Sequence, residues 1–230
     1  MHVVLVHGSY HGPWCWERLT PYLEAAGHRV TAVDLPISDP VLGAAGYADA
    51  IEAQVDWSED PVIVAHSMAG VLAPIVATRR PVARVVYLSA LLPQPGASLA
   101  EQRASEPVDG LVPPTVAEWT DHGDGVWAVG PNTARELFFH DASPADAAWA
   151  AAQLRPQAYV FMNEVTPLVA WPDAPSTYIA CRDDRAVNPA WGREAAHERL
   201  GVTALEIEGG HSPFITRPAE LATLLEPLLR

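Results

Sequence analysis

A serine between two apolar segments is the first sign of chemistry in this chain. Ser67 follows the β-branched run Pro61–Val64 and precedes the small apolar run Val71–Ala73. The first run is typical of a buried parallel strand and the second of a helix. Ala65 and Ala69 stand where the pattern G-x-S-x-G of a nucleophile elbow has glycines. Such a tight turn presents the serine hydroxyl for attack on a carbonyl group. The alternative is a serine that only caps the helix.

A serine nucleophile needs a histidine as base and a carboxylate that orients it, and in this architecture the acid comes before the histidine. Asp183 and Asp184 follow the strand-like run Thr177–Cys181, and His211 follows two glycines after the last strand candidate. We favour Asp184 as the acid, with Asp183 as a solvated neighbour or loop cap. The carboxyl ends of parallel strands share one sheet edge, so Ser67, Asp184 and His211 are expected to meet there. The alternative is a loop histidine without a role.

An acyl-transfer site also needs two backbone N–H groups directed at the developing oxyanion. The N–H of Met68, directly after the serine, is one candidate. The N–H of Ser9 is the other, because Gly8 before it permits a close approach of the backbone. His7 and His66 are predicted to be structural.

Neither a metal nor a cofactor is expected from the residue spacing. The 9 histidines are scattered, and the 2 cysteines are too few for a disulfide framework. The run His7–Gly12 lacks the third glycine of a dinucleotide fingerprint and has no lysine for a phosphate loop.

Strand-like and helix-like segments alternate along the chain. The strand candidates are His2–Val6, Arg29–Val33, Val62–Ala65, Arg84–Leu88, Thr177–Cys181 and Thr203–Ile207. The helix candidates are Glu17–Ala26, Tyr47–Trp57, Met68–Arg79, Pro189–Leu200 and Pro218–Leu229. This alternation predicts an α/β fold in which a mostly parallel, six-stranded sheet is flanked by helices on both faces.

Residues 93–172 interrupt the alternation and are rich in Pro, Ala, Asp and Trp. Ser143, followed by a proline and then by Asp146, has the form of a helix N-terminus. We interpret 93–172 as a helical cap inserted into a core domain of residues 1–92 and 173–230. A second independent domain is the alternative, but so few large aliphatic residues would make a thin core.

Four tryptophans of the cap favour an apolar pocket, with Trp119 and Trp127 as the candidates that line it. The alternative is that the tryptophans form the core of the cap. The cap acids Asp121, Asp124 and Asp141 are expected to keep its surface soluble.

The charge balance excludes some partners. The chain has 230 residues, with 14 basic and 28 acidic side chains and a net charge of −14. Such a surface repels nucleic acids and anionic membranes. No targeting segment or membrane span is visible, so a cytoplasmic location is expected. The partner expected is a small-molecule ester, and the protein is expected to be a monomer or a homodimer.

Together these residues resemble the α/β-hydrolase superfamily, and within it the methylesterase and hydroxynitrile-lyase branch, known from plants and with bacterial relatives. The resemblance covers nearly the whole chain and rests on Leu5–Trp16, Asp34–Pro36, His66–Gly70, Ser143–Asp146, Leu154–Pro156, Tyr178–Cys181 and Gly210-His211. It implies a Ser67–His211–Asp184 triad, an oxyanion hole from the N–H groups of Ser9 and Met68, and a cap over an apolar pocket.

Two departures from that branch bear on the reaction. Hydroxynitrile lyases of this type resemble a pattern with threonine after the first histidine and lysine after the catalytic one, where this chain has Gly8 and Ser212. We therefore expect hydrolysis of a small or aromatic carboxylic ester, such as a methyl ester, through an acyl-enzyme. The alternatives are a lyase or rearrangement catalyst of a biosynthetic pathway, or a ligand-binding protein without catalysis.

Overall fold

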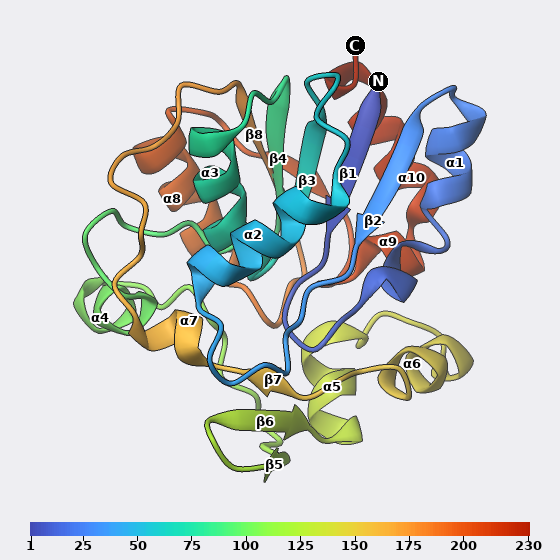
Figure 1. The fold of residues 1–230 in the computed structure, drawn as a ribbon. Helices are drawn as coiled ribbons and strands as arrows, with labels where there is room; N and C mark the ends of the chain where they lie inside the picture. The colour runs from blue at the N-terminus through green and yellow to red at the C-terminus, as the bar shows by residue number, and fades with distance from the viewer.

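A six-stranded sheet forms the centre of the computed structural model, which describes all 230 residues (Figure 1). Every strand pair in it is parallel, and the strand order is β2-β1-β3-β4-β8-β9. The strands are β1 (His2–Val6), β2 (Arg29–Val33), β3 (Val62–His66), β4 (Arg84–Leu88), β8 (Ser176–Cys181) and β9 (Leu205–Ile207). The predicted α/β fold and its six strands are confirmed.

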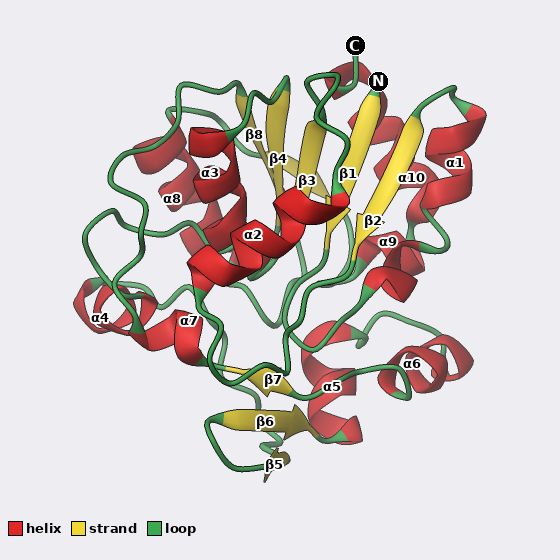
Figure 2. Cartoon of the chain, viewed as in Figure 1, coloured by secondary structure: helices red, strands yellow, loops and turns green.

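Helices cover both faces of this sheet (Figure 2). On the face nearest the viewer lie α2 (Ala44–Gln54), α3 (Ala69–Arg79) and α8 (Pro189–Leu200). Behind the sheet lie α1 (Thr20–Ala25), α9 (Pro213–Thr216) and α10 (Pro218–Leu225), together with the short 3-10 turns η1 (Pro13–Trp16) and η2 (Glu226–Leu228). None of the helices combines the length and the apolar composition that a membrane span requires.

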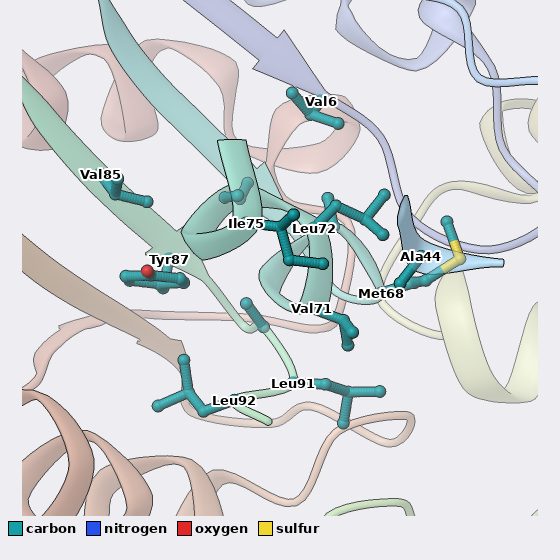
Figure 3. Close-up of a cluster of buried hydrophobic side chains, with 14 of the residues drawn as sticks. Val6, Ala44, Met68, Val71, Leu72, Ile75, Val85, Tyr87, Leu91 and Leu92 are labelled. Atoms are coloured by element: carbon teal, nitrogen blue, oxygen red, sulfur yellow. The ribbon is translucent and has the colours of Figure 1, made fainter. Parts of the chain in front are cut away.

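Alternate strand residues belong to two separate hydrophobic cores. Val4 and Val6 of β1 pack in the core beneath α2, α3 and α8, whereas Val3 and Leu5 pack in the core beneath α1, α9 and α10. Figure 3 shows part of the first core, in which α3 packs on strand residues that include Val6. Both faces of the sheet are therefore buried, which explains the continuous apolar runs of its strands.

Three predicted helices differ by three or more residues from those observed, and proline explains two of the differences. The third is α2, which covers Ala44–Gln54 rather than Tyr47–Trp57. The helix expected over Glu17–Ala26 begins only at Thr20, because Pro21 lacks an N–H group and fits only the first turn of a helix. The last helix ends at Leu225 rather than Leu229, because Pro227 interrupts its hydrogen bonds and leaves the turn η2.

The segment between β4 and β8 lies below the carboxyl ends of the sheet strands (Figure 1). Its helices are α4 (Leu99–Ser105), α5 (Pro131–Phe138), α6 (Pro144–Ala151) and α7 (Val160–Asn163). Helix α6 begins as expected, with the Ser143 side chain accepting a hydrogen bond from the N–H of Asp146. Both predicted boundaries of the cap, at Pro93 and Pro172, lie in loops.

A small antiparallel sheet in this segment was not predicted. It consists of β5 (Trp119–Asp121), β6 (Val126–Val129) and β7 (Gln157–Ala158), in the order β5-β6-β7. These strands have only two to four residues, and β5 is exposed, β6 is mostly half-buried and β7 is buried. They are too short to produce a hydrophobic alternation that a sequence pattern could reveal.

Candidate active site

Ser67 stands in a strained turn between β3 and α3. Its backbone has φ 54°, a left-handed conformation that a residue with a side chain rarely adopts, at a cost of roughly 1–3 kcal/mol. Hydrogen bonds hold the turn: its N–H donates to the carbonyl of Leu88, and its carbonyl accepts from the N–H groups of Gly70 and Leu91. A Cβ atom on Gly70 would lie 2.2 Å from the Leu91 carbonyl oxygen, so glycine is required for this packing. This geometry is that of a nucleophile elbow.

Asp184 and His211 form a buried hydrogen-bonded pair, and both side chains are 1% exposed. His211 Nδ1 donates to Asp184 Oδ2 over 2.8 Å. The other carboxylate oxygen, Oδ1, accepts from the N–H groups of Ala186 and Val187 at 2.8 and 3.0 Å. The carboxylate is thereby fixed, and it directs the Nδ1 N–H of the imidazole toward itself. Asp183 is exposed and does not pair with His211.

His66 connects the turn of Ser67 to the loop of His211. Its Nε2 donates to the His211 carbonyl over 2.9 Å, and the two ring centroids are 4.4 Å apart. Ser67 and His211 form no direct hydrogen bond in this structure. Bonds between a nucleophile and its base are often long without substrate and tighten only in the complex.

The backbone after β1 packs directly against Ser67. A Cβ atom on Gly8 would lie 2.7 Å from the Cβ of Ser67 and 3.2 Å from its Oγ. Ser9 lines the same cavity as Ser67, and the buried Met68 is the N-cap of α3. The two residues expected to supply the oxyanion hole therefore flank the serine from two different elements.

Two buried histidines fix this loop. Leu35 N–H donates to His7 Nε2, so the proton of the ring is on Nδ1, which donates to the carbonyl of Gly8 at 2.9 Å. His11 Nδ1 donates to the carbonyl of Ser9 at 2.7 Å. Burial lowers the pKa of His7 to about 4 and the pKa of His11 to about 3. Burial also lowers the pKa of His66 well below its usual range. These neighbours of His211 are therefore neutral at pH 7.

Ser67 opens into an apolar cavity of about 530 Å³. Of its 18 lining residues 12 are hydrophobic, among them Leu91, Leu137, Phe138 and Phe161. Phe138 also lies next to His211, with the two ring centroids 5.7 Å apart. Of the two tryptophans expected here, Trp119 lines the cavity, whereas Trp127 lines an adjoining hollow.

Asp141 does not have the purely solubilising role that the sequence suggested. Its Oδ2 accepts hydrogen bonds from the Gly210 N–H at 2.9 Å and from the Thr216 hydroxyl at 3.2 Å. Asp141 belongs to the segment between α5 and α6, so it ties that segment to the loop of His211. Because 69 residues separate Asp141 from Gly210, no local pattern could have revealed the contact.

Comparison with known proteins identifies the family of this chain. Residues 3–224 match the alpha/beta hydrolase family, over nearly the full length of the chain. The chain belongs to the alpha/beta hydrolase family. It is 28% identical to salicylic acid-binding protein 2 of Nicotiana tabacum, over 98% of this chain and 96% of that protein. It is 29% identical to methylesterase 7 of Arabidopsis thaliana, over 96% and 94% of the two chains. The expected resemblance to the methylesterase branch is confirmed.

A solved structure shares the fold of this hydrolase. The crystal structure of polyneuridine aldehyde esterase superimposes with a TM-score of 0.82 at 24% sequence identity, covering 99% of this chain and 98% of that one. The sheet, the helices and the segment between β4 and β8 therefore belong to one known architecture.

Acidification should destabilise the folded protein between pH 6.5 and pH 5. His7, His11 and His66 take up protons near pH 6.5 when unfolded but resist protonation when folded, so the unfolded state binds more protons in this range. Each histidine contributes up to about 1.4 kcal/mol per pH unit to the loss of unfolding free energy. Urea unfolding at pH 7.5, 6 and 5 measures this loss of unfolding free energy. In His11→Gln the loss per pH unit should be smaller than in the wild type. A free energy that is constant or higher at pH 5 contradicts the assignment.

Removing the Asp141 carboxylate should slow the reaction of Ser67 with a fluorophosphonate. Asp141→Ala leaves the Gly210 N–H without its acceptor and loosens the loop of His211, and we expect a labelling rate at least ~10-fold lower. Asp141→Asn keeps an acceptor oxygen and should retain more of the rate. Asp121→Ala, which removes an exposed cap acid, is the matched control and should change the rate less than about twofold. Equal rates for all variants would show that Asp141 does not position the loop.

Proposed function

We propose that this hydrolase cleaves carboxylic esters through an acyl-enzyme formed on Ser67. The observation that carries the proposal is the buried Asp184–His211 hydrogen bond beside a strained serine that opens into an apolar cavity. The names of the relatives, among them a methylesterase, support an ester as the substrate.

In the first half of the reaction, His211 Nε2 removes the proton of the Ser67 hydroxyl while Ser67 Oγ attacks the ester carbonyl. The N–H groups of Ser9 and Met68 stabilise the oxyanion that forms. The imidazolium then gives its proton to the leaving alkoxide, the C–O bond of the ester breaks, and an alcohol departs.

In the second half, a water molecule loses a proton to His211 and attacks the acyl carbonyl. The bond to Ser67 Oγ breaks, the serine recovers its proton from His211, and the carboxylic acid leaves. Asp184 keeps the imidazole in the tautomer with Nδ1 protonated and stabilises its positive charge in both halves.

The electrostatics of the site favour a single base. His7, His11 and His66 are buried and neutral, and of the four histidines only His211 donates a hydrogen bond to a buried carboxylate. His7 Nε2 lies 3.9 Å from the exposed carboxylate of Asp34, but it accepts a hydrogen bond from the Leu35 N–H. Positive charge therefore develops on His211 alone when the serine is deprotonated.

The cavity favours a neutral, apolar ester. Its lining is mostly hydrophobic, and the net charge of −14 disfavours the approach of an anion. Small or aromatic methyl esters satisfy both conditions.

Cyanohydrin cleavage is disfavoured at two positions. A side chain on residue 8 would collide with Ser67, so a threonine does not fit there without a shift of the backbone. Ser212 is fully buried and brings no positive charge to assist a departing cyanide.

Another lyase or rearrangement reaction at the same serine is the second candidate function. A panel of methyl, aryl and lactone esters distinguishes such a reaction from hydrolysis.

Ser67→Ala should reduce kcat/KM for a chromogenic short ester by at least ~10³-fold, because the triad acts as a unit. Ser58→Ala, which changes an exposed serine, is the matched control and should retain full activity. Rates are compared from the initial release of the chromophore. An unchanged rate in Ser67→Ala would exclude this serine as the nucleophile.

A further inference from the structure

A second hollow adjoins the cavity that contains Ser67. It has a volume of about 270 Å³ and is lined by Tyr10, Trp119, Trp127 and Tyr159. Three of these, Tyr10, Trp119 and Tyr159, also line the cavity of Ser67. The two spaces therefore share an aromatic wall, and every residue that lines the outer hollow is aromatic.

The two tryptophans stand on one face of the hairpin formed by β5 and β6. Trp119 is paired with Val129, and Trp127 is paired with Asp121, two residues after Trp119. This register makes the tryptophans diagonal neighbours across the strands. They are 38% and 37% exposed, and neither belongs to a hydrophobic core. Tryptophans that formed the core of the cap would be buried, so the exposure of these two contradicts that alternative.

The shared wall holds a pair of hydroxyl groups. The hydroxyl oxygens of Tyr10 and Tyr159 are 2.5 Å apart. One hydroxyl donates to the other, and the hydrogen of the accepting hydroxyl has no acceptor in the protein. Burial raises the pKa of Tyr159 to about 12 and the pKa of Tyr10 still further. Both groups stay protonated, so one O–H donor remains available to a ligand.

We propose that the outer hollow is an aryl-binding subsite for the distal part of the ester whose carbonyl reacts with Ser67. The substrate class is a neutral ester with a second aromatic ring, joined to the ester-bearing part through a hydrogen-bond acceptor such as an ether oxygen. The ring packs on Trp119 and Trp127, and the acceptor bonds to the tyrosine pair. This inference rests on the proposed ester hydrolysis.

The shared lining of the two spaces supports this occupant. Since Tyr10, Trp119 and Tyr159 line both, a ligand in the cavity of Ser67 that contacts these rings lies against the same side chains that border the outer hollow. The hollow has no charged residue in its lining, so it favours an uncharged apolar group over an ion or an acidic peptide.

Three esters test the subsite: methyl phenylacetate, methyl 4-phenoxyphenylacetate and methyl 4-benzylphenylacetate. The second ester has two rings joined by an ether oxygen, and the third replaces this oxygen with CH₂. We expect the wild type to prefer the phenoxy ester in kcat/KM, mainly through a lower KM. Trp127→Ala should reduce the ratio of the phenoxy ester to the single-ring ester about tenfold, whereas Trp127→Phe should retain most of it.

Tyr159→Phe tests the O–H donor that the pair of Tyr10 and Tyr159 offers to the ether oxygen. This variant should reduce the preference for the ether over the CH₂ linker about two- to tenfold, the range expected for one neutral hydrogen bond.

Thr120→Ala is the matched control for the tryptophans, because Thr120 lies on the opposite face of the same hairpin and is exposed. It should leave all ratios unchanged.

Failure of the subsite is distinguishable from failure of the proposed hydrolysis. If the wild type hydrolyses the esters but Trp127→Ala keeps the same ratios, the subsite is wrong and hydrolysis stands. If none of the esters is hydrolysed, the binding of the corresponding methyl ketones is measured by calorimetry. Tighter binding of the phenoxy ketone than of the single-ring ketone, lost in Trp127→Ala, supports the subsite without the hydrolysis. Equal binding of the two ketones rejects the subsite. A dimer that dissociates in Trp127→Ala, with unchanged ratios, would assign the hollow to a second copy of the chain.

Discussion

The buried hydrogen bond between Asp184 and His211 is the interaction on which the rest of the site depends. A carboxylate buried to this extent is costly unless its oxygens are fully bonded, and here two backbone N–H groups and one imidazole N–H bond it. The loop that supplies these N–H groups is in turn held by the segment between β4 and β8, since Val112 N–H donates to the carbonyl of Ala186 and Asn188 N–H to that of Gly110. This segment therefore supports the loop of Asp184 and also contributes residues to the wall of the cavity.

A cluster of neutral histidines gives the site its second constraint. His7 and His11 hold the carbonyls of Gly8 and Ser9, and His66 holds the carbonyl of His211, so each ring acts as a fixed donor. Because burial keeps these rings uncharged, they position the backbone without competing with His211 for a proton. The same burial makes the fold sensitive to acid, which links the stability of the protein to the chemistry of its site.

Features that follow from strand and turn patterns in the sequence were predictable, whereas contacts between segments without such a pattern were not. The sheet could be predicted because its strands are buried on both faces, and the turn of Ser67 because Ala65 and Ala69 permit close packing. The pairing of Asp184 with His211 followed from the position of both residues after parallel strands. The contact of Asp141 with Gly210 and the tyrosine pair could not be predicted, because they join residues 69 and 149 positions apart. The hairpin β5–β6 escaped prediction because its strands are short and half-exposed.

The proposed reaction requires that Ser67 becomes covalently acylated during turnover, and mass spectrometry of the quenched reaction detects this acyl group. The protein is mixed with excess of a short ester, stopped in acid within milliseconds to seconds, and digested. We expect a mass increase equal to the acyl group on the peptide that contains Ser67, and no such increase when His211 is replaced by alanine. Continued turnover without an acylated Ser67 peptide, or with the acyl group on another residue, would contradict the proposed reaction.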